Sequence, residues 1–396
     1  MKFSHLADCH IGSWKDEKLN TLSTEAFLRA MDISKEEHVE FILIAGDIFN
    51  TALPAIDKLK AVTKKLREVK ERDISVYIIP GSHDFSPSGK TILDVLEHAG
   101  LLINVVKGAV VDNKLQLRWT EDKSGAKITG MFGKKGSLEK KYYDSLDIPA
   151  LEAEQGFKIF MFHSPIAELK PAELYHMDAA PLSYLPRYCN YYAGGHVHAV
   201  QHASFETHQN IVYPGPLFPN SFSELEKLKH GGFFMYDNGA ITFKEIIIHP
   251  VQSIIIYANH ESAAVVYGKL KEQCEKISAE NAIIAIRVIG ELSEGKTADI
   301  DFKAIKEMLE QKGAWHVMKS TSQLKAKEFQ EIRITGSTAD IEERIIDEHA
   351  SQFQGENQKE LTKMFLKILN TEKLEGERIV DFENRVRKDV EEIMKF

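Results

Sequence analysis

The chain has 396 residues, 43% of them hydrophobic and 28% charged, a composition that excludes a disordered or fibrous protein. This length is too great for one compact core and predicts two domains with a short appendage. The formal net charge of −9 excludes a surface that is cationic everywhere, so contacts with nucleic acid would need local patches, loops or metal ions.

The region from residue 1 to residue 248 alternates short apolar runs with charged amphipathic segments, which is typical of an α/β fold. Several of these runs end at Gly, Asp or His. The clearest predicted strands are residues 2–8, 41–47, 75–81, 158–164 and 191–196. Amphipathic helices are predicted over residues 56–70, where apolar side chains recur at helical spacing, and over residues 91–98.

A smaller α/β domain is expected at residues 249–335, because the pattern restarts after Pro250. Its predicted elements are a strand at 253–258, a helix at about 262–277, a strand at 282–290, a helix at about 301–311 and a strand at 315–320.

Residues 336–396 form the predicted C-terminal helical segment, with three helical stretches and no strand. The last two stretches carry apolar residues at near-helical spacing: Leu361, Phe365, Ile368 and Leu369, then Ile379, Phe382, Val386 and Val390. Two short helices with one apolar face each bury little by themselves, so we expect them to need a partner surface.

Each of the five predicted strands delivers possible metal ligands at or just beyond its C-terminal end, where α/β sheets generally place their sites. In chain order these residues are Asp8 and His10, Asp47, Ser82 and His83, His163, and His196 and His198. In extended backbone, residues two apart project to one side, so Asp8 with His10 and His196 with His198 should each present a pair. Cys9 would then face away and pack in the core, and His5, on the same strand face as Phe3, is also expected there.

This mixture of carboxylates and imidazoles suits two divalent ions a few ångströms apart, which can activate a water and neutralise a phosphoryl transition state. Asp47, which follows Gly46, is the natural bridging ligand. A single Asp-x-His or His-x-His motif is weak, because such residues are more often ordinary core histidines or turn carboxylates. The order and placement of all five elements is what indicates a metal site.

The motifs resemble those of SbcD-type DNA nucleases in the calcineurin-like metallophosphoesterase superfamily. The matching stretches are ADCHIG, IAGDIFN, PGSHDFS, MFHSPI and GGHVHA, followed by YPGP and SFSELEKLKHGGFFMY. The resemblance is strong over residues 1–248 and matches the remainder in layout only. It implies an α/β fold with a four-layer α/β/β/α sandwich, a small α/β capping domain that helps position DNA, and C-terminal helices that bind the coiled coil of an SMC-like ATPase.

The resemblance also implies roles for individual residues. One ion would be held by Asp8, His10, Asp47 and His198, and the other by Asp47, His163, His196 and Ser82, with manganese as the usual metal. His83 corresponds to the histidine thought to protonate the leaving oxygen; an orienting role beside the ligands is the alternative. The family commonly has asparagine where this chain has Ser82, which predicts a weaker second ion or a water in the gap.

The expected function is a manganese-dependent nuclease that processes DNA double-strand breaks, with duplex-end exonuclease and single-strand endonuclease activity. Family resemblance implies a homodimer through helices 56–70 and 91–98, although both helices could equally only cover the sheet. One alternative is another phosphatase or phosphodiesterase of the superfamily, although Gly46-Asp47 lacks the VDRG-like continuation of the protein phosphatases. A DNA-end-bridging scaffold with weak catalysis is the other alternative, and Ser82 is the feature that favours it.

The cysteines and the N-terminus predict a cytoplasmic protein, and the resemblance to DNA nucleases implies association with the nucleoid. The three cysteines, Cys9, Cys189 and Cys274, are far apart and have no CxxC spacing, which fits a reducing compartment. Asp8 and His10 stand where a signal peptide would need an uninterrupted apolar stretch. No apolar run reaches the roughly 18 residues of a membrane span, so no membrane association is expected.

Overall fold

The computed structural model describes residues 1–85, 91–134, 140–170 and 178–326, together with a C-terminal helix and a few residues that precede it. The chain divides into two compact units, residues 1–327 and residues 328–396. The domain boundary expected near residue 248 lies inside the first unit, between its two α/β parts, and stays a prediction.

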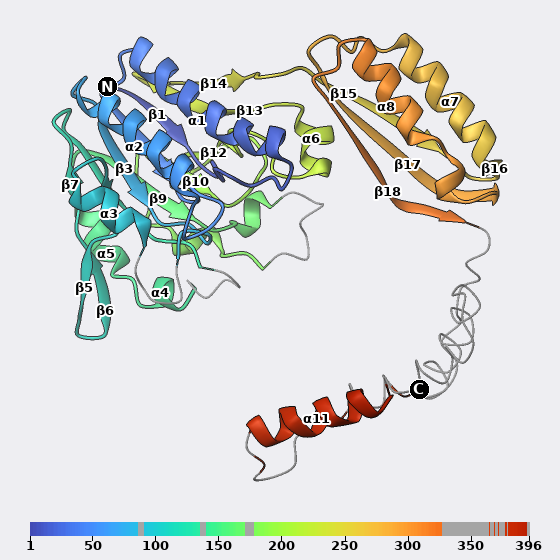
Figure 1. The fold of residues 1–396 in the computed structure, drawn as a ribbon. Coiled ribbons are helices and arrows are strands. Elements are labelled where there is room, and N and C mark those ends of the chain that lie inside the picture. The colour runs from blue at the N-terminus through green and yellow to red at the C-terminus, as the bar shows by residue number, and fades with distance from the viewer. Residues whose placement is uncertain are drawn as a thin grey trace. The chain divides into compact units, whose positions relative to one another are not determined.

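The larger α/β part contains two six-stranded sheets (Figure 1). The first has the order β14-β13-β1-β2-β3-β4 and the second the order β11-β12-β10-β9-β8-β7. The strands of the first sheet are β1 (Lys2–Leu6), β2 (Phe41–Ala45), β3 (Ser75–Ile79), β4 (Ile103–Asn104), β13 (Gly231–Asp237) and β14 (Ala240–Ile246). Those of the second are β7 (Thr120–Glu121), β8 (Ala126–Gly130), β9 (Phe157–His163), β10 (Tyr191–Gly195), β11 (Gln201–Phe205) and β12 (His208–Tyr213).

In the first sheet β1 to β4 run parallel, and β13 and β14 add antiparallel strands at one edge only. In the second sheet the four central strands run parallel, and β11 and β7 are antiparallel at the two edges. The two sheets pack face to face through an apolar layer, in which Phe3 stacks on Phe41 with ring centroids 4.9 Å apart and meets Tyr191 of the second sheet edge-on at 5.0 Å. Every residue of β2 is buried, which explains its continuous apolar run. Strands β1, β2, β3, β9 and β10 match the five strands predicted to end at site residues, which confirms that prediction.

Helices cover the outer face of each sheet, which completes the four-layer α/β/β/α sandwich (Figure 1). The first sheet is covered by α1 (Glu17–Glu36), α2 (Ile56–Lys70), α3 (Ile92–His98) and α6 (Phe222–Leu228), and the second by α4 (Lys140–Asp144) and α5 (Ile148–Ala153). Short 3₁₀ helices lie at Ala167–Leu169 and Leu182–Tyr184, with another at Thr297–Asp299 in the smaller α/β part, and a separate hairpin is formed by β5 (Gly108–Val111) and β6 (Lys114–Leu117). The fold class expected from the motifs is thus confirmed.

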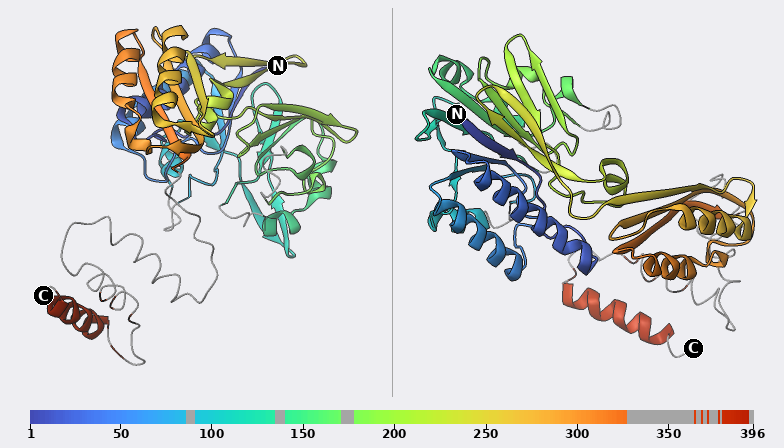
Figure 2. Two further views of the ribbon diagram at one scale, coloured as in Figure 1. Left: turned by 90° about the vertical axis from the view of Figure 1, so that its right-hand side faces the viewer. Right: turned by 90° about the horizontal axis from the view of Figure 1, so that it is seen from above.

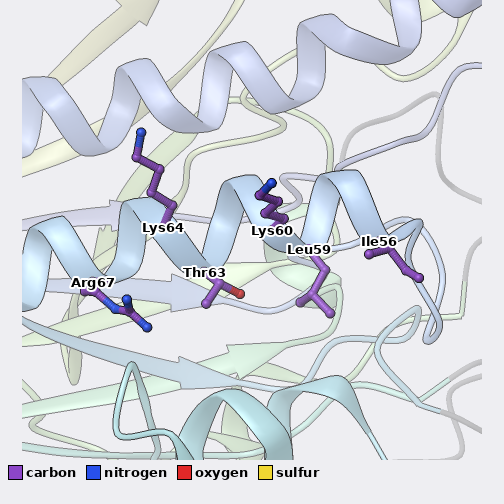
Figure 3. Close-up of a pocket in the computed structure, with 6 residues that line it drawn as sticks. All are labelled: Ile56, Leu59, Lys60, Thr63, Lys64 and Arg67. Atoms are coloured by element: carbon purple, nitrogen blue, oxygen red, sulfur yellow. The ribbon is translucent and has the colours of Figure 1, made fainter.

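Helix α2 has two faces of different character. Val62, Leu66 and Val69 are buried against the first sheet. The outer side carries Ile56 and Leu59 beside cationic residues, and together they line a shallow hollow on the surface (Figure 3).

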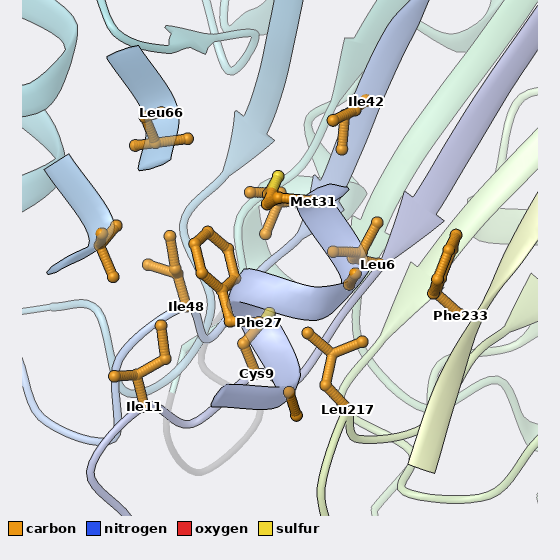
Figure 4. Close-up of a cluster of buried hydrophobic side chains, with 14 of the residues drawn as sticks. Leu6, Cys9, Ile11, Phe27, Met31, Ile42, Ile48, Leu66, Leu217 and Phe233 are labelled. Carbon is orange, nitrogen blue, oxygen red and sulfur yellow. The ribbon is translucent and has the colours of Figure 1, made fainter. Parts of the chain in front are cut away.

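The apolar core between the first sheet and its helices contains the cysteine next to Asp8 (Figure 4). Cys9 is fully buried in this core, which confirms its expected packing role. His5 is also fully buried, and its Nδ1 lies 3.0 Å from the Tyr191 hydroxyl, so its place in the core is confirmed as well.

The smaller α/β part, residues 251–326, is called the cap below. Its elements are β15 (Val251–Tyr257), β16 (Glu261–Ser262), α7 (Ala263–Lys276), β17 (Ile283–Glu294), α8 (Phe302–Gln311) and β18 (His316–Ala326). All four strands run parallel, and β17 pairs with the other three. Helices α7 and α8 lie side by side over one face of the sheet (Figure 2) and enclose a core of their own with it. These elements confirm the pattern predicted after Pro250.

The second unit contains α11 (Ile379–Ile393), which coincides with the last predicted helical stretch. Along α11, Phe382, Val386 and Val390 are half-buried, whereas Val380 is 63% exposed. The other two predicted stretches lie almost entirely outside the described residues. Among the residues that the structure describes, none of the helices has the length and apolar content needed to cross a membrane.

Candidate metal centre

The C-terminal ends of β1, β2 and β3 in the first sheet meet those of β9 and β10 in the second sheet at one edge of the sandwich. Two glycines allow this close approach. A Cβ atom on Gly46, whose φ is +89°, would lie 2.3 Å from His163 Nδ1, and one on Gly195 would lie 2.0 Å from the Ala45 carbonyl oxygen. Side chains at either position would push the two sheets apart.

Asp47 lies at the centre of this edge. Its Oδ2 is 3.1 Å from His163 Nε2, 3.7 Å from His10 Nε2 and 3.3 Å from the Ser82 hydroxyl oxygen. Its Oδ1 accepts a hydrogen bond from the backbone N–H of His83 at 2.7 Å. One carboxylate therefore contacts residues at the ends of three other strands, β1, β3 and β9.

Asp8 is the second buried carboxylate of the cluster and is fully shielded from solvent. Both of its oxygens lie 3.0 Å from the backbone nitrogen of His196, which donates to them. Its Oδ1 is 3.7 Å from His198 Nε2 and 4.0 Å from the Nε2 atoms of both His10 and His163. Asp8 thus lies between His10, which follows the first sheet, and His163 and His198, which come from the second.

All eight residues singled out in the sequence meet at this edge. Within the described part of the chain, three groups of side chains bring their ligand atoms within 4.8 Å of one another: Asp8, His10 and His198; His10, Asp47 and His83; and Asp8, Asp47 and His163. His196 lies just outside these groups, with its ring centroid 5.2 Å from that of His163. Ser82 is 6% exposed and reaches the cluster through Asp47.

The backbone at the cluster is left-handed rather than extended. The φ angles are +48° at Asp8, +40° at His10, +53° at Asp47 and +83° at His196. Non-glycine residues adopt such angles at a cost, and they concentrate at functional sites. The expectation of extended backbone at these pairs was therefore wrong, because Asp8, His10 and His196 lie in tight turns after the strands.

The donor set fits divalent cations. His163 Nδ1 lies 2.8 Å from the Ala45 carbonyl, which can only accept, so Nδ1 carries the proton and Nε2 faces the carboxylates. Burial opposes a charge on His163, yet Asp47 outweighs it and raises the pKa of His163 to about 9. The Nε2 atoms of His10 and His198 are only 3.2 Å apart. The buried carboxylates of Asp8 and Asp47 thus attract positive charge, and imidazole nitrogens surround them. Divalent transition-metal ions supply that charge and bind both kinds of ligand.

Two carboxylates of the site were missed in the sequence. Asp84 is 1% exposed, and its Oδ2 accepts from the backbone nitrogens of Asp47 at 2.9 Å and Gly81 at 2.8 Å. Its position directly after His83 in the PGSHDFS motif was a usable signal. Glu224 on α6 places Oε1 3.1 Å from His198 Nδ1. Because Glu224 lies in a charged, amphipathic segment, nothing in the sequence distinguished it from a solvated helix residue.

Comparison with known proteins gives a family match and several relatives. The sequence model of the calcineurin-like phosphoesterases matches residues 1–200. The chain is 24% identical to the DNA double-strand break repair protein Mre11 of Archaeoglobus fulgidus, over 78% of this chain and 76% of that protein. It is 28% identical to the protein of the same name from Methanococcus maripaludis, over 60% of this chain and 62% of that protein. For the one from Methanopyrus kandleri, the identity is 27% over 62% of this chain and 56% of the relative.

Proposed function

The chain belongs to the calcineurin-like phosphoesterase family, and on this premise we propose that it is a manganese-dependent nuclease that processes DNA double-strand breaks. The observation that carries the proposal is the cluster around Asp47, where carboxylates and imidazoles from both sheets meet. The DNA substrate is supported by the archaeal relatives, which are named as DNA double-strand break repair proteins. Duplex-end exonuclease and single-strand endonuclease activity are part of the same proposal.

We assign the ligands in two sets that share Asp47. The first set is Asp8, His10, Asp47 and His198, and the second is Asp47, His163, His196 and Ser82. The central position of the Asp47 carboxylate supports its role as the bridge. When bound, the two ions supply an activated water and neutralise charge on the phosphoryl oxygens. Manganese is proposed from the family resemblance, because the carboxylates suit manganese whereas the imidazoles equally suit iron and zinc.

His83 is proposed as the proton donor to the leaving oxygen. Its Nδ1 lies 2.8 Å from the Asn50 carbonyl oxygen, which can only accept, so Nδ1 carries a proton and the ring is fixed. Nε2 is therefore the ring nitrogen that would hold and transfer the proton given to the leaving oxygen. The ring meets that of His10 edge-on at 4.8 Å between centroids, so it lies beside the ligand cluster.

Metal content and DNA cleavage measured together test this assignment. We expect Asp47→Asn to lose both bound ions and cleavage, because the shared carboxylate loses its charge. His83→Ala should lose cleavage and keep both its metal content and its affinity for DNA. Loss of metal from His83→Ala would make His83 a ligand or its support, and full metal binding by Asp47→Asn would refute the bridging role.

A homodimer through α2 and α3 is part of the proposal. Leu53, in the loop before α2, and Ile56, the first residue of α2, are 81% and 83% exposed, and Val95 on α3 is 60% exposed. Covering the sheet accounts for the buried face of α2. It gives no role to Ile56, which lies on the outer side of the helix (Figure 3). Exposed apolar side chains of this size on neighbouring helices are typical of a protein interface.

We also propose that the C-terminal segment binds the coiled coil of an SMC-like ATPase and that the complex is associated with the nucleoid. On α11, Phe382, Val386 and Val390 recur every four residues and are half-exposed. Such a stripe suits a helical partner surface. A test by truncation is given with the other predictions.

A further inference from the structure

Helix α6 contacts both the metal centre and the cap. It has seven residues, Phe222–Leu228, and begins at Ser221, whose hydroxyl accepts from the backbone nitrogen of Glu224 at 3.2 Å. Leu225 anchors the helix in the core of the first sheet. Glu224 and Glu226 are two residues apart, which on a helix places them about 200° apart around the axis. One of them faces His198, and the other faces the cap.

Glu224 contacts the ring of His198, a proposed metal ligand, through one carboxylate oxygen. Its other oxygen contacts the backbone of Asn220. Its Oε1 lies 3.1 Å from His198 Nδ1, and its Oε2 accepts from the backbone nitrogen of Asn220 at 2.8 Å. As the carboxylate can only accept, Nδ1 of His198 carries a proton, and Nε2, 3.7 Å from Asp8 Oδ1, is the ring nitrogen left to bind an ion. Metal-binding histidines commonly have such a partner on the nitrogen that does not bind the ion.

On the opposite side, Arg287 of β17 links the cap to α6, and Lys229 at the end of α6 donates to the Ser253 hydroxyl of β15. The Nε of Arg287 donates to Glu226 Oε2 at 2.8 Å, and its Nη2 donates to the Ser223 hydroxyl at 3.1 Å. The guanidinium also lies 4.9 Å from the ring centroid of Phe222. Arg287 and Glu226 are only 16% and 12% exposed, so this ion pair is largely shielded from solvent.

We infer that Glu224 is a positioning residue that fixes the orientation of His198, and that the cap holds Glu224 in place through the contact of Arg287 with α6. The inference rests on the proposed metal site and adds a physical path from the cap to one of its ligands. Any movement of the cap that breaks the contacts of Arg287 would remove the support that Ser223 and Glu226, on either side of Glu224, receive from the cap. The cap would then influence metal binding without contributing a ligand.

The first test is manganese binding by the full chain after metal removal, measured by isothermal titration calorimetry. In Glu224→Gln the single amide oxygen cannot accept from both Asn220 and His198, and its NH₂ group favours the opposite histidine tautomer. We expect one of the two sites to bind manganese about ten- to one-hundred-fold more weakly. Thermal unfolding of the metal-free variant checks that the fold is kept. Unchanged manganese binding by a folded Glu224→Gln protein would overturn the inference.

The second test separates the cap contact from general damage. We expect Arg287→Met to weaken the same site several-fold, and the double variant Glu224→Gln/Arg287→Met to be no weaker than Glu224→Gln alone, because both changes act through one contact. Lys269→Met is the matched control, since Lys269 pairs with Glu261 inside the cap. Additive losses, or equal losses in Lys269→Met, would refute the path through α6. A wild-type chain that binds no manganese would instead refute the proposed metal site itself.

Discussion

Ser82 is the residue at which this chain departs from the asparagine expected in the family, and its replacement tests how the second ion is held. The side chain is 6% exposed, and its hydroxyl donates to Asp47 Oδ2 at 3.3 Å. A hydrogen bond to a charged acceptor contributes roughly 1.5–3 kcal/mol, and the length of this one places it at or below the lower end. Losing about 1.4 kcal/mol corresponds to about a tenfold change in affinity.

We therefore expect Ser82→Ala to raise the manganese concentration needed for half-maximal DNA cleavage by up to about tenfold, because Asp47 loses a donor that helps orient its bridging oxygen. Ser4→Ala is the matched control: Ser4 is fully buried on β1, and its hydroxyl lies 2.8 Å from that of Ser34, away from the cluster. This control should lower thermal stability and leave the manganese titration unchanged.

The companion variant Ser82→Asn restores the amide carbonyl of the family. If serine only tolerates a weak second ion, this variant should lower the manganese requirement, and Ser82→Ala should be silent. That pair of results would refute the reasoning from the Asp47 contact. An unchanged titration for Ser82→Asn together with a weakened one for Ser82→Ala would support serine as a working member of the second site.

Three further predictions follow from other parts of the chain. Burial lowers the pKa of His5 to about 3, so the folded chain keeps it neutral while the unfolded chain takes up a proton below pH 6.5. The free energy of unfolding should therefore fall by about 2 kcal/mol more in the wild type than in His5→Gln between pH 7 and pH 5, as measured by urea unfolding with EDTA present; equal losses would contradict this. Ile56→Glu should convert a dimer into a monomer at micromolar concentration in light scattering, whereas a wild type that is already monomeric would show that α2 only covers the sheet. Truncation after Gln354 should abolish co-purification with the ATPase and preserve manganese-dependent cleavage; unchanged co-purification would exclude the C-terminal segment as the main binding surface.

The sequence predicted the parts of the fold that depend on local pattern. Strands such as Phe41–Ala45 are short apolar runs ending at Gly-Asp, and α2 is found at the predicted residues 56–70 because its apolar positions recur every three or four residues. The order of the strands in the second sheet and its packing on the first were not available from such patterns. They depend on contacts between distant residues, such as Phe3 with Tyr191.

The metal centre also combines features that the local sequence predicts with features that depend on distant contacts. The residues that follow the strands were predictable because parallel strands deliver their C-terminal ends to one edge. The left-handed turns at Asp8 and His196 were not predicted, since neither residue is a glycine. Glu224 was also missed, because its contact with His198 depends on where α6 packs and on no feature of its own segment.

The most direct test of the account compares phosphodiester and phosphomonoester substrates under one set of conditions. The purified full chain is incubated with manganese and linear duplex DNA, single-stranded DNA, a bis-aryl phosphate or a mono-aryl phosphate, with EDTA and Asp47→Asn as controls. The account predicts cleavage of DNA that requires manganese and disappears in both controls. Hydrolysis of the phosphomonoester with no cleavage of DNA under any divalent ion would contradict it.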